Sequence, residues 1–491
     1  MNKSNAVLLL FLALALTLLA GCGGSAAPNA PVPLTPAPLS ANNLNLIFVV
    51  SEDLAYSAPG DINPNTANLT NQGLQRSLLM GTFLKQNVLG GSNVTSVYAL
   101  EPMTHLQTAN NYADMAGLET VQQFAMLNQI TLSYPGYPPY PGNNYPINAS
   151  YGSGPLPSGV PPWSQICSSC QGLDFNDEEG DNEALITDIV KAKANFPGFY
   201  VFSAPWETTS ALLANINALE GYNLTLPAQY SGPNYIYAIS IAPSGSATFV
   251  TYNSNVNPSS TYPVLPAEKI VSAPCTQQTA FSITVTGGQG GAVVPAGTNT
   301  NETVYFIRHA EAHPQSYWSD NNYVGAGQWR ALDLPNALRG KISPQQVISA
   351  DPSQFSQGSI SASGDSNYST LAPALTAEPY AIANNLPYNL VTSFQLSDQN
   401  AAQETSDTLF TRSTFSNQTV LVAWVYQQIA PTVNALLTTY HGNGPPAPDW
   451  PDTDYDTIWT VKLDDHGNLS IDNAMCEGIN SGALPSTPPQ F

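Results

Sequence analysis

Two stretches of this chain carry the same features in the same order, and that order limits the possible folds more than any other property of the sequence. Each stretch begins with a short apolar run, residues 46–50 and 304–307, which is typical of a buried strand. Each then reaches a glycine, Gly73 or Gly327, that opens a helical pattern. The chain therefore appears as an internal repeat of one structural unit.

The later features continue the parallel between the two halves. They are an apolar strand with a proline turn (97–102 and 347–352), a helix start (107–109 and 375–377), a strand followed by a helix (200–206 and 420–424), and a last strand followed by a glycine (234–239 and 456–461). Strands that alternate with helices predict the α/β class. We expect two tandem three-layer α/β/α domains.

The repeat also sets the expected domain limits. We predict a first domain over 44–275 and a second over 302–480, joined by a linker over 276–301 and followed by a tail over 481–491. A loop rich in proline, glycine and tyrosine, with an acidic run after it, interrupts the first domain as an insertion over 134–181. The acidic run at 173–181 lacks the glycine spacing of a helix-loop-helix calcium site, so it is interpreted as a solvated loop.

The N-terminal segment has the features of an export signal. Lys3 precedes an apolar run, and residues 19–22 read Leu-Ala-Gly-Cys, which resembles the cleavage motif of bacterial lipoproteins. This predicts a signal peptide over 1–21, a lipid on Cys22 and a proline- and alanine-rich tether over 22–43. The expected location is the bacterial cell envelope, with the membrane bound through that lipid. An ordinary signal peptide or a membrane anchor is the alternative.

The charge balance excludes one broad class of function. The chain has 12 Lys+Arg against 34 Asp+Glu, a formal net charge of -22. Nucleic-acid binders obtain most of their affinity by neutralising phosphates, so we expect no nucleic-acid partner. The same balance argues against docking on anionic lipid by charge alone.

The remaining cysteines point to disulfide bonds. Cys167, Cys170, Cys275 and Cys476 are an even number in a chain that is predicted to be exported. Four cysteines allow three connectivities, and the sequence does not choose among them. The Cys167–Cys170 spacing also fits a redox pair, but no basic context is evident to activate it.

The second repeat carries the one motif with a chemical meaning. Residues 304–313 read Val-Tyr-Phe-Ile-Arg-His-Ala-Glu-Ala-His. An apolar strand that ends in Arg-His, followed by the helix of Thr376, Ala377 and Glu378, resembles the histidine phosphatase superfamily, which has a phosphoglycerate-mutase-like fold. The resemblance implies two histidine-phosphatase-like domains, with no cofactor and a small phosphorylated substrate.

The same resemblance assigns roles at the motif. It makes His309 the nucleophile that forms a phosphohistidine and Arg308 a ligand of the phosphate. An imidazole can attack phosphorus, and a guanidinium can bind two phosphate oxygens at once. Glu311 is a weaker candidate for a catalytic role, and a turn-capping role is the alternative.

Three departures from the family pattern bear on activity. Ala372 stands at the position of the second arginine, and Tyr426 stands at that of the second histidine. In the first repeat Glu52 replaces the nucleophile, so that half is interpreted as non-catalytic. We therefore expect phosphomonoester hydrolysis that is weak or lost, with Tyr426 as a substitute hydrogen-bond donor. The alternative is a catalytically inactive binding or scaffold lipoprotein.

A different chemistry is also open at this motif. His309, Glu311 and His313 alternate along an extended segment, so their side chains could share one face. Three such ligands with an open position would suit a zinc-dependent hydrolase. Repulsion between the metal and Arg308 weighs against this alternative.

Overall fold

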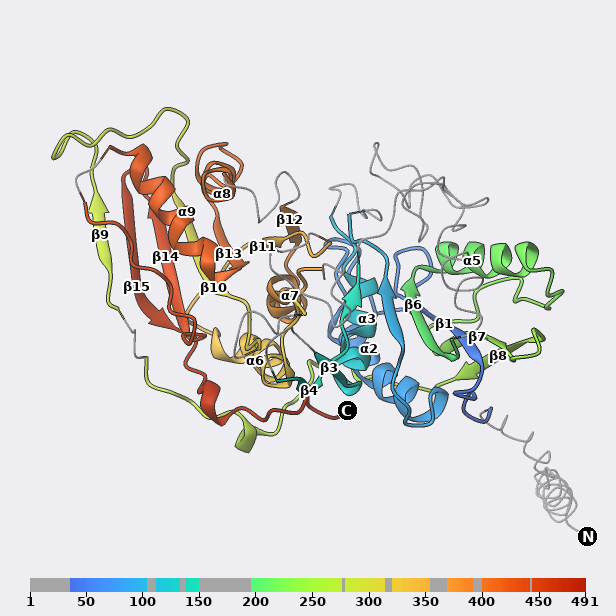
Figure 1. Ribbon diagram of the computed structural model, residues 1–491. Coiled ribbons are helices and arrows are strands. Elements are labelled where there is room, and N and C mark those ends of the chain that lie inside the picture. The colour runs from blue at the N-terminus through green and yellow to red at the C-terminus, as the bar shows by residue number, and fades with distance from the viewer. Residues whose placement is uncertain are drawn as a thin grey trace, which may run out of the picture. The chain divides into compact units, whose positions relative to one another are not determined.

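In its described residues the computed structural model contains a six-stranded and a seven-stranded β-sheet, both with helices on their faces, and a two-stranded hairpin (Figure 1). It describes residues 36–103, 112–132, 138–149, 196–275, 279–313, 320–353, 369–391, 400–441 and 444–491. The predicted signal peptide, Cys22, most of the tether, the helix start at 107–109, Cys167, Cys170 and the acidic run at 173–181 lie outside these residues. Within the described ranges no helix combines the length and the apolar character that crossing a bilayer requires.

The first sheet has the strand order β5-β2-β6-β1-β7-β8. Its strands are β1 (Leu44–Val50), β2 (Ser96–Ala99), β5 (Ile147–Asn148), β6 (Gly198–Ala204), β7 (Tyr235–Ile241) and β8 (Ala247–Asn253). Its helices are α2 (Asn71–Phe83), which continues as a π-helical turn over Leu84–Val88, α3 (Ala116–Leu127) and α5 (Trp206–Leu219). A separate hairpin pairs β3 (Ile130–Leu132) with β4 (Tyr140–Asn143).

The second sheet has the order β12-β11-β13-β10-β14-β15-β9. Its strands are β9 (Ser282–Val285), β10 (Glu302–Arg308), β11 (Gln346–Ala350), β12 (Tyr388–Val391), β13 (Thr419–Trp424), β14 (Thr457–Leu463) and β15 (Leu469–Cys476). Its helices are α6 (Gly325–Ala337), α7 (Ala372–Asn384), α8 (Ala401–Phe410) and α9 (Tyr426–Thr439). Short 3₁₀ turns lie at Ala267–Lys269 and Ser481–Ala483.

The two sheets share their topology. The first six strands of the second sheet follow the order of the first sheet strand for strand. In each sheet the central strand, β1 or β10, pairs in parallel with one neighbour and antiparallel with the other. The α/β class is therefore confirmed, with two sheets of matching design.

Alternating side chains explain why both faces of each sheet are covered. Along β10, Val304 and Phe306 pack in a cluster with α8 and α9, while Ile307 packs on the opposite face with α6 and α7. Along β1, Phe48 packs on the α5 face and Val49 on the α2–α3 face. Apolar side chains on both faces make the strands near-continuous hydrophobic runs, as in parallel sheets generally.

The helices on the facing sides of the sheets form a shared junction. One apolar cluster includes Leu118 of α3, Leu334 of α6 and Leu375 of α7, and residues 37–491 make one compact unit. Figure 1 shows α2, α3, α6 and α7 between the two sheets. Buried amides add specific contacts there, because Gln122 and Asn322 donate to each other at 3.2 and 2.9 Å.

Parts of the predicted linker, insertion and tail are built into the fold. The expected linker, 276–301, contributes β9, which pairs with β15 at the edge of the second sheet. The expected insertion, 134–181, contributes β5 at the edge of the first sheet. The expected tail packs on the junction, where Gln123 donates to the carbonyl of Pro489 at 2.9 Å. One disulfide joins Cys275 to Cys476, which selects a pairing that the sequence left open.

Helix starts depend on contacts that the sequence pattern does not carry. The predicted start of α2 at Gly73 is two residues late, because the hydroxyl of Thr70 accepts from the backbone of Gln72 and Gly73. The glycines themselves are needed for close packing. A Cβ on Gly73 would lie 2.2 Å from the carbonyl oxygen of Asp61, and one on Gly327 would lie 2.6 Å from that of Glu311.

Replacing Gly327 by alanine should destabilise the second half. The added methyl group would press on the backbone at Glu311, which is too rigid to yield without shifting the strand-end loop. We expect a loss of about 1–3 kcal/mol of unfolding free energy, measured by chemical denaturation. Gly482→Ala is the matched control, because its nearest contact would be at 3.5 Å. Equal stability of the two variants would contradict this account of Gly327.

Candidate active site

The candidate site lies where the central strands of the second sheet end. Arg308 is the last residue of β10 and is paired with Trp424, the last residue of the parallel strand β13. His309 comes directly after Arg308 and Tyr426 comes two residues after Trp424, so both lie at the same edge of the sheet. In open α/β sheets this carboxyl edge is where ligands bind.

His309 is buried and held in one tautomer. Its Nδ1 lies 2.9 Å from the carbonyl oxygen of Ala310, which can only accept, so Nδ1 carries the proton and Nε2 carries the lone pair. Burial and then the charge of Arg308 lower the pKa of His309 from 6.5 to about 3. The imidazole is therefore neutral at physiological pH, which is the form that can act as a nucleophile.

Arg308 is clamped between two aromatic rings. Its guanidinium carbon lies 4.1 Å from the ring centre of Tyr426 and 3.8 Å from that of Tyr455. Its Nη1 donates to the carbonyl of Asp452 at 2.8 Å and, at 3.4 Å, to those of Pro451 and Asp454. Cation–π contacts and neutral carbonyls position the charge without neutralising it.

Two N–H groups of Arg308 are available to a ligand beside Nε2 of His309. Nη2 lies 3.5 Å from Nε2 of His309, and Nε is buried without a hydrogen-bond partner. An anion beside His309 could accept from these groups. A positive charge next to a neutral imidazole is what transfer of a phosphoryl group requires.

Ala372 and Tyr426, which the sequence resemblance aligned with a second arginine and a second histidine, both lie close to the motif. The backbone N–H of Ala310 donates to the hydroxyl of Thr376 at 2.8 Å, and that hydroxyl donates to the carbonyl of Ala372 at 2.6 Å. The N-terminus of α7 thus lies against the strand-end loop, but Ala372 brings no charge. Tyr426 contributes its ring, whose centre is 5.9 Å from that of His309.

Glu311 is engaged in a buried ion-pair cluster. Nε and Nη2 of Arg330 donate to the carboxylate of Glu311 at 2.7–2.9 Å. Nη1 of Arg330 donates to the carboxyl group of Glu477 at 2.5 Å. Asp456 lies 3.7 Å from the same Nη1. Burial, reinforced by repulsion from Asp456 and Glu311, raises the pKa of Glu477 to about 8. Arg330 is therefore engaged in this ion-pair cluster together with Glu311, and the catalytic role of Glu311 stays a prediction.

The alternative zinc site is not formed. His313 pairs with Asp320 at 3.2 Å and its ring packs edge-on against Tyr140 at 5.4 Å, while Glu311 binds Arg330. Within the described part of the chain, the group of three side chains whose ligand atoms lie close together is Asp464, Asp465 and His466, all exposed. Within the described residues His309, Glu311 and His313 therefore do not form a close group of ligand atoms, and two of the three side chains are engaged in ion pairs.

The equivalent edge of the first sheet carries acids. Glu52 lies after β1, and burial, followed by repulsion from Asp61, raises its pKa to about 9. Arg76 of α2 is 2.6 Å from Asp61 and 3.6 Å from Glu52. The arginine near these acids in the described residues is thus paired, and the described residues of the first half contain no histidine.

The sequence did not single out Tyr455 as part of the site. Its ring covers Arg308, and its hydroxyl accepts from the backbone of Ala312 at 3.4 Å. A contact that spans 147 positions leaves no local pattern.

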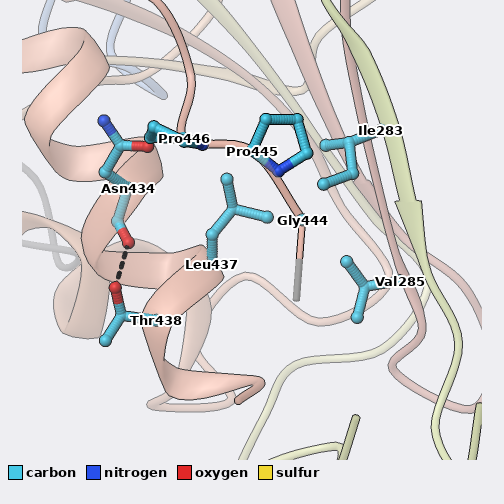
Figure 2. Close-up of a pocket in the computed structure, with 8 residues that line it drawn as sticks. All are labelled: Ile283, Val285, Asn434, Leu437, Thr438, Gly444, Pro445 and Pro446. Carbon is cyan, nitrogen blue, oxygen red and sulfur yellow. Dashed lines mark hydrogen bonds between the residues drawn. The ribbon is translucent and has the colours of Figure 1, made fainter. Parts of the chain in front are cut away.

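A pocket lies elsewhere on the second sheet. It has a volume of about 160 Å³ and is formed between β9, the end of α9 and the segment at Gly444 (Figure 2). Figure 2 shows Ile283, Val285, Leu437 and the two prolines around it. None of the side chains of the candidate site lines it.

Comparisons with known proteins give the following. No protein-family model and no curated protein matches the chain. Among solved structures, it is similar to the protein histidine phosphatase SixA in complex with tungstate, at 20% identity and a TM-score of 0.24 over 36% of this chain and 97% of that chain. It is also similar to a phosphoserine phosphatase variant from Entamoeba histolytica in complex with phosphoserine, at 13% identity and a TM-score of 0.18 over 38% and 100%. Likenesses of this size bear on the fold at most.

Removing the charge of Arg330 should destabilise the site region strongly. Arg330→Met would leave Glu311 buried without a counter-charge and Glu477 without its hydrogen-bond donor, which typically costs about 3–5 kcal/mol. The free energy of unfolding by denaturant titration checks this. Arg412→Met is the matched control, because Arg412 is exposed. A loss at Arg330 no larger than at Arg412 would mean that the cluster contributes nothing.

Proposed function

We propose that the protein is a histidine-phosphatase-like phosphomonoesterase of low turnover that works through a phosphohistidine on His309. The observation that supports this most is the neutral imidazole of His309, fixed by the Ala310 carbonyl and facing the guanidinium of Arg308. The substrate class is a small phosphomonoester, because one arginine can balance only a limited negative charge.

The proposed reaction has two steps. Nε2 of His309 attacks phosphorus, the bond to the ester oxygen breaks, and that oxygen takes up a proton from solvent water and leaves as the alcohol. Water then attacks the phosphohistidine, which releases phosphate and restores the imidazole. Nη2 and Nε of Arg308 would bind the phosphoryl oxygens in both steps.

Tyr426 would assist as a hydrogen-bond donor. Burial raises the pKa of its phenol above 10, so it keeps its proton at neutral pH and can donate to a phosphoryl oxygen. A phenol that holds its proton so firmly is a poor acid for the leaving group. This is the physical reason to expect slow turnover.

A second function is a binding protein that holds a phosphorylated ligand without hydrolysing it. It is favoured by Ala372 and by the pairing of Arg330, which together leave Arg308 as the one guanidinium directed at His309 among the described residues. Loss of one charge-assisted contact costs about 1.5–3 kcal/mol and weakens the transition state more than a ground-state complex.

We further propose that the chain is a lipoprotein of the bacterial cell envelope, anchored through Cys22, with a duplicated domain of which the first copy is non-catalytic. The disulfide between Cys275 and Cys476 supports an oxidising compartment. Glu52 at the position of the nucleophile supports a non-catalytic first copy, because a buried carboxyl group whose pKa is raised to about 9 keeps its proton at neutral pH and offers no nucleophile like the imidazole of His309.

Hydrolysis of p-nitrophenyl phosphate by the purified full-length protein tests the enzyme hypothesis. We expect slow turnover that His309→Ala abolishes and that His466→Ala, a change of an exposed histidine, leaves intact. Because the pKa of His309 is about 3, the imidazole stays neutral in mild acid, so turnover should show no loss near pH 6.5. Equal background in all three proteins would favour the binding function instead.

Restoring the two missing family residues should raise turnover. Ala372→Arg adds a cation next to the strand-end loop, and Tyr426→His adds a proton-transfer group. Such groups are worth roughly 10²–10⁴ in rate, so the double variant should exceed the wild type by about 10-fold or more in kcat/KM. His309→Ala in that background is the control. An inactive double variant that remains folded would count against the proposed placement of these positions.

A further inference from the structure

Two buried carboxyl groups lie on helices of the junction between the sheets, and the charge of one acts on the other. Glu119 lies on α3 and Glu378 on α7, and their residues are 4% and 0% exposed. Both oxygens of Glu378 and Oε2 of Glu119 are buried without a hydrogen-bond partner. Buried carboxyl groups without partners are costly, so each needs an explanation.

The groups around these two carboxyls are acids and phenols. Asp114, just before α3, acts on Glu378 together with Glu119. Burial and the charges of both carboxyl groups raise the pKa of Tyr323, which lies before α6. Burial and the charge of Glu119 likewise raise the pKa of Tyr262, and burial and the charge of Glu378 raise the pKa of Tyr388 of β12. In the described part of the chain, no lysine, arginine or histidine acts on either carboxyl.

A buried acid pair without a cationic side chain can be neutralised by a metal ion or by protons. The described residues place no third ligand for a metal, since the close group of potential ligands is at Asp464, Asp465 and His466 instead. Protons therefore remain. Burial raises the pKa of Glu119 to about 8, and burial with repulsion from Glu119 and Asp114 raises that of Glu378 well above 4.5.

We propose that the junction is a proton-dependent latch, in which Glu119 and Glu378 are protonated when α3 and α7 are packed together and loss of those protons drives the two helices apart. No chemistry beyond proton release is involved. The proton is the ligand of this site. Its binding favours the packed contact between the two halves of the chain.

The sign of the pH dependence follows from the direction of the shifts. In the packed state the two carboxyl groups keep their protons, whereas an exposed glutamic acid loses its proton near pH 4.5. The contribution to stability is therefore complete below that pH and is lost as the pH rises through about 8. Alkaline pH opens the latch.

Separation of α3 and α7 would affect the candidate active site, because α7 also contacts the loop that carries His309. Thr376 lies two residues before Glu378 on the same helix and accepts the N–H of Ala310, next to His309. A displacement of α7 would release that contact. The latch itself does not depend on the proposed phosphatase activity.

Hydrogen exchange resolved by peptide tests the latch in the full-length protein. After correction for intrinsic rates, peptides of α3 and α7 should exchange about 10-fold faster or more at pH 9 than at pH 6, since one pH unit above a pKa changes an opening equilibrium about tenfold per group. The double variant Glu119→Gln/Glu378→Gln should remove most of this increase. Glu302→Gln is the matched control, because burial raises the pKa of Glu302 to about 8 inside the second sheet, away from the junction.

Three outcomes would overturn the proposal. In the first, the α3 and α7 peptides of the wild-type protein exchange equally fast at both pH values. This outcome can be observed without any variant. Another is an increase that Glu302→Gln removes as fully as the double variant does. The third is metal found in the purified protein, with a chelator opening the junction at pH 6, because the neutralising charge would then be a cation. The single variant Glu378→Gln replaces the double variant if the latter does not fold.

Discussion

The guanidinium of Arg330 organises the second half of the chain. It binds Glu311, which follows the motif after β10, and Glu477, which follows the last strand β15. These carboxylates come from opposite ends of the domain sequence, and both are buried. The direction of the strand-end loop, and with it the orientation of His309, is therefore tied to the exit of the C-terminal strand. An ion pair of this kind defines one arrangement more than it adds stability.

The first half also has a buried arginine that pairs with acidic side chains, but the partners are different. Arg76 lies three residues after Gly73, as Arg330 lies three residues after Gly327, and it binds Asp61 and Glu52. Both helices thus fasten the segment that leaves the central strand. The fastening is common to the two halves, whereas the chemistry at the strand ends is not. An imidazole beside a clamped guanidinium stands in one half, and carboxylates stand in the other.

Sequence reasoning succeeded where burial is continuous and failed where contacts are distant. The apolar runs of β1, β10 and β13 were predicted, because a strand covered on both faces needs such side chains throughout. The edge strands β5 and β9 were missed, since two to four residues carry no pattern. At the site, Arg308 and His309 follow from the motif at the strand end. The clamp by Tyr455 and the pairing of Glu311 do not, because their partners are far away in the sequence.

The disulfide between Cys275 and Cys476 has a consequence for the integrity of the chain. It joins the segment before β9 to the end of β15, so every strand of the second sheet lies within the loop that it closes. A single protease cut anywhere between these cysteines would leave the two fragments covalently linked. The second half can therefore be nicked in its surface loops without being shed from the remainder of the molecule, and only reduction would release the pieces.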